Sequence, residues 1–314
     1  MAPRPIIVDC DTGRDDALAI ALALASPAEF DVLGITTVAG NIPVSLAWRN
    51  SRFVCELCGR GDVRVFQGAS GPLNGRLVTA EHVHGQSGIE GVAVAEPRGR
   101  PETQPAVEFL IETLRAARDN SVTLIVTGPA TNIALAIAAA PGLLPKIREI
   151  SLMGGAWREV GNVTPSAEFN VYVDPQAANM VLHCGRPITM IGLDATHKVL
   201  ARPAHAEHLA KSGSSAANAL APLLRVMPST NKARYCDDAI PIHDPCTLVV
   251  LLQPDLFTLR HVNVEVEQEG RFTTGATVVD RWNVSGRQPN AQWAVDVDGE
   301  AVLNMLTARL MRLP

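Results

Sequence analysis

Short apolar runs alternate with helix-like stretches along most of this 314-residue chain. Strands that are separated by helices indicate βαβ units, which build an open, mainly parallel sheet with helices on both faces. The predicted strands are 5–8, 32–38, 63–66, 122–126, 147–153 and 188–193, and the predicted helices are 15–25, 43–58, 105–118, 131–139 and 175–184. Ligands of such α/β sheets bind at the carboxyl ends of the strands, so the residues there indicate function.

Four aspartates, Asp9, Asp11, Asp15 and Asp16, lie where the first predicted strand meets the first predicted helix. Carboxylates this close repel one another unless they share a cation, and a hard divalent cation with oxygen ligands is the simplest arrangement. A helix N-terminus would by itself favour Asp15 and Asp16, but it does not explain Asp9 and Asp11. The spacing is not that of an EF-hand, because Gly13 comes one residue too early, and no Gly-Lys-Ser/Thr of a P-loop follows. The cluster therefore predicts a metal site.

The ends of the later predicted strands are polar but carry almost no lysine or arginine. Phosphate groups are bound by Arg, Lys or glycine-rich amide cradles, so a phosphate ligand is disfavoured. A neutral polyhydroxylated ligand is bound by groups that accept and donate hydrogen bonds, and together with a metal this indicates a sugar. The residues at these ends and in the adjacent loops include Asn41, Thr127, Asn132, Asn162, Glu168, Asn170, Asp174, Asp194, Thr196, His197, His243 and Asp244.

The composition indicates a globular protein that acts on a small molecule. Hydrophobic residues make up 47% of the chain and charged residues 19%, which is enough for a large core. The net charge of −5 gives no basic surface for nucleic acid or an anionic membrane. No apolar run approaches the roughly 18 residues of a membrane helix, and the run before Asp9 is too short for a signal peptide. We expect a cytoplasmic protein whose six cysteines are reduced, with Cys55 and Cys58 packed on one helix face.

The length allows one large domain or two smaller ones, and no internal repeat or convincing interdomain linker is present. Residues at about 203–243 are interpreted as a helical insertion. Residues 260–298 are interpreted as hairpin-like strands with intervening turns. We therefore expect a single domain that spans residues 1–314.

The motifs at these strand ends are similar to those of one enzyme family. The run Asp9-Cys-Asp-Thr-Gly-Arg-Asp-Asp16 closely resembles the N-terminal signature of the inosine-uridine nucleoside hydrolase family. The resemblance continues in the family's order with residues 35–41, 82–85, 127–132, 152–155, 167–170 and 243–246. It implies the Rossmann-like fold of that family, a tightly bound calcium ion, and hydrolysis of a ribonucleoside to free base and ribose.

The resemblance also implies a set of metal ligands. Asp11, Asp16, Asp244 and the backbone carbonyl of Thr127 would bind calcium, and water and ribose hydroxyls would complete its six to eight oxygens. Calcium lowers the pKa of bound water less than zinc does, so a base is still required. Asp11 is the carboxylate that we assign to this role.

The remaining family positions imply how ribose is held. Asp15 and Asn170 would bind the 2′- and 3′-hydroxyls, with Asp244 shared between the metal and this diol. The 5′-hydroxyl would be bound by Asn162 and Glu168, and the ribose site would also include Asn41 and Met153. Carboxylates around ribose would stabilise the positive charge of an oxocarbenium-like transition state.

Protonation of the departing base needs a group that titrates near neutral pH, and histidine is suited to it. His84 and His243 are the candidates, and the sequence does not decide between them. We assign His243 a catalytic role and place His84 on the base side of the substrate. His82 and His197 are interpreted as structural residues.

The chain departs from the family pattern at two places. Thr12 stands where proline is usual, and we expect it to loosen the turn without removing a ligand. The stretch 229–235 lacks the aromatic pair with which some members stack the base, although Tyr235 is available. Purine or pyrimidine preference therefore stays open. A homodimer or homotetramer is expected from the resemblance alone.

Two other functions are each compatible with part of the sequence. The strand followed by Asp9-x-Asp11 also resembles the haloacid-dehalogenase phosphatase motif, but the order Thr12-Gly13 is reversed and no strand-end lysine for phosphate is evident. A ribose- or nucleoside-binding protein without catalytic activity is the second alternative. The presence of both Asp11 and His243 favours an enzyme.

Overall fold

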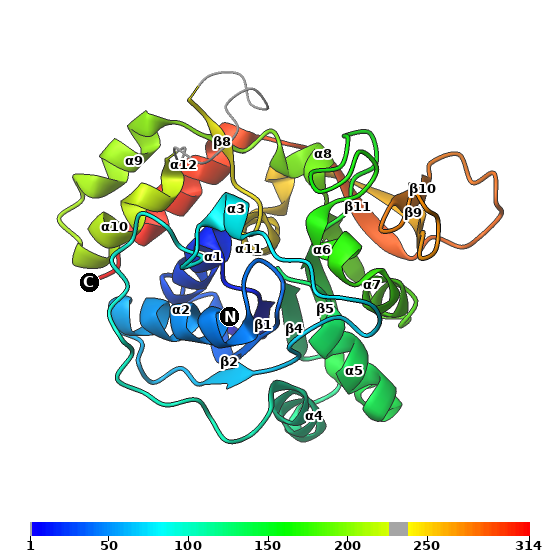
Figure 1. Ribbon diagram of the computed structural model, residues 1–314, viewed down its shortest axis with the longest axis horizontal. Helices are drawn as coiled ribbons and strands as arrows, with labels where there is room; N and C mark the ends of the chain where they lie inside the picture. Colours follow the sequence, from blue (N-terminus) through cyan, green and yellow to red (C-terminus); the bar gives the residue numbers. More distant parts are fainter. Residues whose placement is uncertain (1, 226–237) are drawn as a thin grey trace.

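The computed structural model describes residues 2–225 and 238–314 (Figure 1). Within these residues the main sheet has nine strands in the order β10-β9-β11-β6-β5-β4-β1-β2-β3. Strands β1 to β6 and β11 run parallel, whereas β9 pairs antiparallel with β10 and β11. The strands are β1 (Arg4–Cys10), β2 (Phe30–Thr37), β3 (Val65–Gln67), β4 (Val122–Val126), β5 (Ile147–Met153), β6 (Ile188–Ile191), β9 (Phe257–Val266), β10 (Thr277–Asp280) and β11 (Ala291–Val297). The predicted open, mainly parallel sheet is confirmed.

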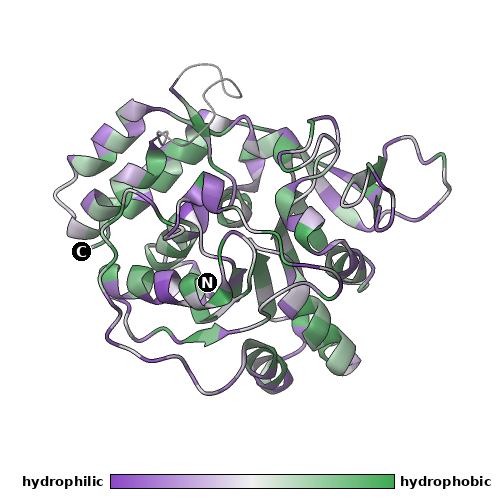
Figure 2. Ribbon diagram, in the orientation of Figure 1, coloured by the Kyte–Doolittle hydropathy of each residue, from purple (hydrophilic) through white to green (hydrophobic). Residues whose placement is uncertain are grey.

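Helices cover both faces of this sheet. Successive side chains of β1 alternate between two buried cores, with Ile6 and Val8 in one and Ile7 in the other, as the pleat of a strand requires. In Figure 2 the central strands are mostly hydrophobic. The first core contains residues of α1 (Arg14–Leu24), α2 (Val44–Leu57), α11 (Cys246–Leu252) and α12 (Gly299–Leu310), and the second contains residues of α4 (Ala106–Ala116), α5 (Thr131–Ala139) and α7 (Pro175–Leu182).

The strand order reverses between β1 and β4. From β1 the chain continues outward through β2 to β3, and from β4 it continues in the other direction through β5 to β6. Such a switch point is where open α/β sheets bind ligands. Asp9 near the end of β1 pairs with Val126 at the end of β4, so the aspartates after β1 lie beside the loop that begins at Thr127.

The predicted and observed elements differ mainly at the second half of the sheet. Strand β6 ends at Ile191 rather than residue 193, because the short helix α8 (Leu193–Thr196) follows at once. Strands β9 and β10 form the expected hairpin, but β11 also pairs in parallel with β6 and so joins this hairpin to the main sheet. An alternating apolar pattern does not reveal which neighbour a strand pairs with, so the parallel pairing was not predicted.

The described part of segment 203–243 is largely helical, as predicted. It contains α9 (Pro203–Ala210), α10 (Ser215–Leu220) and the 3₁₀ helix η2 (Ala221–Leu224), which pack in the same core as α1. Residues 226–237 lie outside the described part, including Tyr235. The segment is flanked by β7 (Leu200–Ala201), which pairs with β8 (Ile240–Pro241).

The remaining short helices are α3 (Glu81–His84), α6 (Phe169–Val173), and the 3₁₀ helices η1 (Pro141–Lys146) and η4 (Pro254–Leu256). In the two described ranges, no helix has the length and apolar character needed to cross a membrane. The described cysteines, Cys10, Cys55, Cys58, Cys184 and Cys246, are free thiols as expected, and Cys236 lies outside the described residues.

Candidate active site

The turn between β1 and α1 buries Asp11 and Asp16 completely. The backbone N–H of Gly13 donates to Asp16 Oδ2 at 2.9 Å, so this carboxylate caps the first turn of α1. The other oxygen, Asp16 Oδ1, accepts a hydrogen bond from Thr127 Oγ1 at 2.8 Å. Asp16 therefore joins the loops that follow β1 and β4. Helix capping explains part of the position of Asp16 and none of that of Asp11.

Thr12 fastens this turn to helix α2. Its hydroxyl is 2.5 Å from Ser51 Oγ, and its carbonyl accepts a hydrogen bond from Asn50 Nδ2 at 3.1 Å. All three residues are buried. The hydroxyl of Thr12, which proline would lack, thus adds a contact to the turn, while the expectation that threonine loosens the turn relative to proline stays a prediction.

Asn41 connects Asp11 with Asp16. The backbone N–H of Asn41 donates to Asp11 Oδ2 at 2.6 Å, and its Nδ2 donates to Asp11 Oδ1 at 3.0 Å and to Asp16 Oδ2 at 3.2 Å. The loop approaches so closely that a Cβ at Gly40 would lie 2.1 Å from Asp11 Oδ2. A glycine is therefore required where the loop after β2 meets the aspartates.

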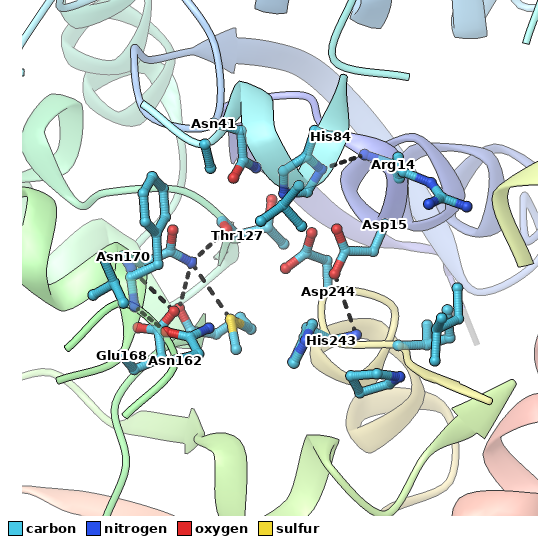
Figure 3. A pocket seen from close by; sticks show the side chains of 18 of the residues that line it. Arg14, Asp15, Asn41, His84, Thr127, Asn162, Glu168, Asn170, His243 and Asp244 are labelled. Atoms are coloured by element: carbon cyan, nitrogen blue, oxygen red, sulfur yellow. Dashed lines mark hydrogen bonds between the residues drawn. The ribbon is translucent and has the colours of Figure 1, made fainter. Parts of the chain in front are cut away.

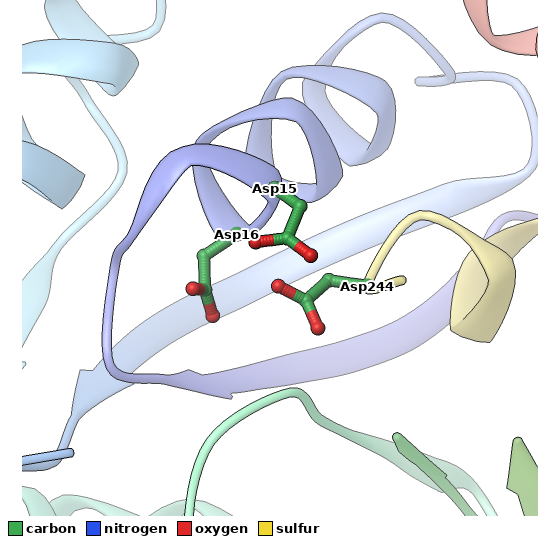
Figure 4. A group of neighbouring side chains, drawn as sticks. All are labelled: Asp15, Asp16 and Asp244. Carbon is green, nitrogen blue, oxygen red and sulfur yellow. The ribbon is translucent and has the colours of Figure 1, made fainter. Parts of the chain in front are cut away.

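Three carboxylates, those of Asp15, Asp16 and Asp244, face one another (Figure 4). Asp15, Asp16 and Asp244 each offer an oxygen, and these oxygens lie within 4.8 Å of one another. Burial raises the pKa of Asp16 to about 7, and the charge of Asp15 adds to the effect. Burial also raises the pKa of Asp11 and of Asp244 well above the ordinary value, and neighbouring carboxylates raise both further. A divalent cation would relieve this accumulation of charge.

The carbonyl of Thr127 adds a neutral oxygen beside the carboxylates. It accepts a hydrogen bond from Asn170 Nδ2 at 2.8 Å, which orients it and leaves a second lone pair. The Thr127 N–H donates to the Asp9 carbonyl at 2.8 Å, so the register of β1 and β4 fixes its place. All of these candidate ligands are oxygens, which suits a hard cation such as calcium and not a soft metal. Asp15, which we predicted as a ribose ligand, is also close enough to bind the cation.

A cavity of about 270 Å³ opens above these carboxylates (Figure 3). Among the predicted site residues, Asp11 and Asp16 do not line it but lie buried beneath its floor, where Asp15 and Asp244 are exposed to the cavity. The predicted residues that line it are Asp15, Asn41, His84, Thr127, Met153, Asn162, Glu168, Asn170, His243 and Asp244. Residues from six separate parts of the sequence that we predicted to act together thus surround one cavity.

Glu168 and Asn162 line the cavity beside helix α6. Glu168 is the N-cap of this helix, and its carboxylate accepts hydrogen bonds from the N–H groups of Asn170, Val171 and Gly155. Burial raises the pKa of Glu168 despite these bonds. Asn162 Oδ1 accepts a hydrogen bond from the N–H of Phe169 at 2.8 Å. Both side chains therefore shape this wall as well as presenting polar groups to it.

His84 and His243 lie near Asp15. His84 Nδ1 accepts a hydrogen bond from the N–H of Arg14 at 3.2 Å, and the N–H of His243 donates to Asp15 Oδ2 at 3.3 Å. Burial lowers the pKa of each imidazole to about 4, while the Asp15 charge opposes this shift. Both rings are thus uncharged at neutral pH. His82 also lines the cavity, whereas His197 does not line it and packs edge-on against His243.

Asp9 links the strand that carries the aspartate cluster to its neighbours. Its Oδ1 accepts hydrogen bonds from Thr36 Oγ1 at 2.5 Å and Asn132 Nδ2 at 2.8 Å, which ties β1 to β2 and α5. Its Oδ2 has no hydrogen-bond partner within the described residues. Burial raises the pKa of Asp9 to about 7. The sequence groups Asp9 with the metal-binding cluster, but its side-chain hydrogen bonds are to Thr36 and Asn132, which is the position of a structural residue.

Two further residues were not predicted. Arg14 lines the cavity, and its Nη2 donates to the carbonyls of Pro222, Leu223 and Arg225. Thr196 lies behind His243, with 2.7 Å between Thr196 Oγ1 and His243 Nδ1. The only sequence signal for Arg14 was a single cation inside an acidic motif. Thr196 stood at a polar strand end with no indication of its partner.

Three carboxylates close enough to share a cation, beside a cavity lined by the amides of Asn41, Asn162 and Asn170, suit a hard metal ion and a polyhydroxylated ligand. The sequence profile described as inosine-uridine preferring nucleoside hydrolase matches residues 6–304. The chain is 44% identical to the pyrimidine-specific ribonucleoside hydrolase RihA of Klebsiella pneumoniae, over 98% of each protein. It is 42% identical to an uncharacterised Schizosaccharomyces pombe protein, over 98% of this chain and 99% of the relative.

Solved structures agree with the sequence comparison. A plant nucleoside hydrolase superposes with a TM-score of 0.92 at 33% identity, over 98% of this chain and 99% of that one. A purine-preferring ribonucleoside hydrolase from Gardnerella vaginalis superposes with a TM-score of 0.90 at 32% identity, over 98% of each chain. The chain belongs to the inosine-uridine preferring nucleoside hydrolase family. It is a ribonucleoside hydrolase, a glycosidase that acts on N-glycosyl bonds, and the phosphatase alternative is excluded.

Proposed function

We propose that the protein hydrolyses pyrimidine ribonucleosides in preference to purine ribonucleosides, with calcium bound at the carboxylate cluster. The observation that supports the reaction is the convergence of the Asp15, Asp16 and Asp244 carboxylates beside a cavity that Asp15, Asp244 and Thr127 line. The base preference rests on the 44% identity to RihA, which is described as pyrimidine-specific. The 32% identity to a purine-preferring hydrolase is lower, so it supports a purine preference less strongly.

Asp11, Asp16, Asp244 and the Thr127 carbonyl are the proposed calcium ligands, with Asp15 close enough to contribute. Calcium bound there would neutralise the carboxylates and polarise the attacking water. Asp11 is the proposed base that accepts the proton of this water. Asn41 supports this role because its two N–H donors orient the Asp11 carboxylate at 2.6 and 3.0 Å.

Ribose is proposed to lie with its diol toward Asp15, Asn170 and Asp244, which line one part of the cavity. Its 5′-hydroxyl would face Asn162 and Glu168 at the α6 wall, with Asn41 and Met153 completing the contacts. Positive charge that develops on the sugar would be stabilised by the surrounding carboxylates. The Glu168 carboxylate is held by backbone N–H groups before substrate binds, so it needs little reorganisation.

The nucleobase is proposed to leave toward His84 and His243. Both imidazoles are uncharged at neutral pH, so each is able to donate a hydrogen bond from a neutral N–H and neither adds positive charge beside the sugar. His243 is the proposed hydrogen-bond donor that stabilises the departing base. His82 lines the same side of the cavity without an assigned role.

We also propose that the chain forms a single domain and acts in the cytoplasm as a homodimer or homotetramer. Free cysteines, four of the five described ones being buried, are consistent with a reducing compartment. Light scattering coupled to size-exclusion chromatography measures the oligomeric state, and a monomer would contradict this part of the proposal.

The base preference is tested by kcat/KM for uridine, cytidine, inosine and adenosine with the calcium-loaded protein. Higher values for uridine and cytidine are expected. Higher values for inosine and adenosine would refute the pyrimidine preference and leave the hydrolase intact. Tight binding of nucleosides without turnover would instead support the non-catalytic alternative.

A further inference from the structure

The turn after β6 contributes no residue to the proposed reaction, but it contacts His243. Its segment 194–197 includes Thr196, which is fully buried in α8. The hydroxyl of Thr196 lies 2.7 Å from Nδ1 of His243, and Thr196 does not line the cavity. His243 itself lines the cavity. A buried hydroxyl thus holds one nitrogen of an imidazole whose ring borders the substrate site.

The direction of this hydrogen bond follows from the surroundings of Thr196. A buried hydroxyl loses free energy if its proton has no acceptor, so it donates to whatever acceptor is in reach. Within the described residues, His243 Nδ1 is its only hydrogen-bond partner. If Nδ1 carried a proton, the hydroxyl would accept and its own proton would be left unpaired. The favoured arrangement has the Thr196 hydroxyl donating to an unprotonated Nδ1.

We propose that Thr196 is a positioning residue that fixes the ring orientation of His243 and favours the tautomer with its proton on Nε2. This inference rests on the proposed role of His243 as hydrogen-bond donor to the departing base. With Nδ1 accepting from Thr196, Nε2–H is the donor left to hydrogen-bond the departing base. Loss of the hydroxyl would allow the tautomer with the proton on Nδ1, which cannot donate from Nε2.

The same turn is rigid enough to act in this way. The Asp194 carboxylate accepts hydrogen bonds from the N–H groups of Trp157 at 2.9 Å and Arg158 at 2.8 Å, which fixes the turn to the loop after β5. The ring of His197 packs edge-on against His243, with 5.9 Å between centroids. His243 is thus held by Thr196 at one nitrogen, by His197 at the ring and by Asp15 at its backbone N–H.

The test compares Thr196→Val with Thr196→Ser on two leaving groups. Valine keeps the branched shape and removes the donor, whereas serine keeps the donor. The substrates are uridine, whose base needs a hydrogen bond as it departs, and p-nitrophenyl riboside, whose leaving group is stable as an anion without one. For Thr196→Val we expect kcat on uridine to fall about tenfold or more, out of the roughly 10²–10³-fold that one hydrogen-bond donor to a developing anion contributes. KM for uridine and turnover of p-nitrophenyl riboside should change little, and Thr196→Ser should restore uridine turnover.

Thr307→Val is the matched control, because Thr307 is a buried helical threonine in α12 whose hydroxyl donates to the Leu303 carbonyl, and it does not line the cavity. Thr307→Val should lower the free energy of unfolding without lowering kcat on uridine more than kcat on p-nitrophenyl riboside. The inference would be overturned if Thr196→Val lost turnover equally on both substrates. It would also be overturned if Thr196→Val hydrolysed uridine at the wild-type rate. If wild-type protein hydrolyses neither substrate, the proposed function fails and not this inference.

A second measurement keeps the inference testable if Thr196→Val does not fold. The ¹⁵N chemical shifts of the His243 ring, assigned with a His243→Asn variant, distinguish the two tautomers in the wild-type protein. In the uncharged ring we expect protonated Nε2 and unprotonated Nδ1. A protonated Nδ1 in the uncharged ring would refute the proposed role of Thr196.

Discussion

Replacing Asp244 with asparagine tests how the buried carboxylates depend on a cation. Burial, followed by the charges of Asp15, Asp16 and Asp11, raises the pKa of Asp244 well above its ordinary value. In the metal-free protein, Asp244 therefore keeps its proton in the folded state, while in the unfolded chain it ionises above about pH 4. Folding takes up this proton, so the group has no effect below about pH 4 and destabilises the folded state as the pH rises further.

The magnitude follows from proton linkage. One carboxyl held protonated lowers the free energy of unfolding by about 1.4 kcal/mol per pH unit until the pH reaches its pKa in the folded state. Asparagine has the shape of the neutral acid but no ionisable proton. Above about pH 4, Asp244→Asn should therefore gain about 1.4 kcal/mol per pH unit over the wild type in the presence of a chelator, until the pH reaches the pKa of Asp244 in the folded state.

The assay is urea unfolding at several pH values, with chelator and with calcium. Calcium at a hundredfold excess over its Kd should stabilise the wild type by about 2.7 kcal/mol, and Asp244→Asn much less. Two parallel pH profiles in chelator would show that Asp244 is not held protonated. Equal stabilisation of both proteins by calcium would show that it is not a ligand.

Three more substitutions test separate parts of the site. Asp11→Ala should lower kcat by several orders of magnitude, because it removes the proposed base and a calcium ligand together, and near-wild-type turnover would exclude this assignment. Asn162→Ala should weaken ribose binding and lower kcat/KM for uridine, so an unchanged kcat/KM would argue against its contact with the 5′-hydroxyl. Arg14→Leu leaves the carbonyls of 222, 223 and 225 without their cationic donor and should lower the free energy of unfolding by about 1–3 kcal/mol. Arg14→Lys should recover part of that loss in urea unfolding, and wild-type stability of Arg14→Leu would contradict the role of these hydrogen bonds.

Much of the fold was predictable because local patterns determine it. The predicted boundaries of β4, β5 and α5 agree with the structure, since each is an apolar run bounded by turn residues. The parallel pairing of β11 with β6 was not predictable in this way. It depends on which sheet edge is available after the rest of the chain has folded, and no local signal records that edge.

The residues that line the cavity were predictable because their chemistry lies in contiguous motifs at strand ends. The residues that contact and position them were not predictable, because their partners are distant in sequence. Thr196 and His243 are 47 residues apart, and Arg14 and Leu223 are 209 residues apart. The burial of Asp11 and Asp16 beneath the cavity floor likewise depends on the approach of Asn41 from β2. Such second-layer contacts require the packed structure.

The central claim is that the buried carboxylates hold calcium that ribonucleoside hydrolysis requires. Ribose release from uridine and cytidine, measured before calcium removal, after it and after calcium is returned, tests this claim most directly. The structure predicts that release stops in the metal-free protein, resumes with calcium, and does not resume in Asp11→Ala. Full turnover by folded, metal-free protein would contradict the claim.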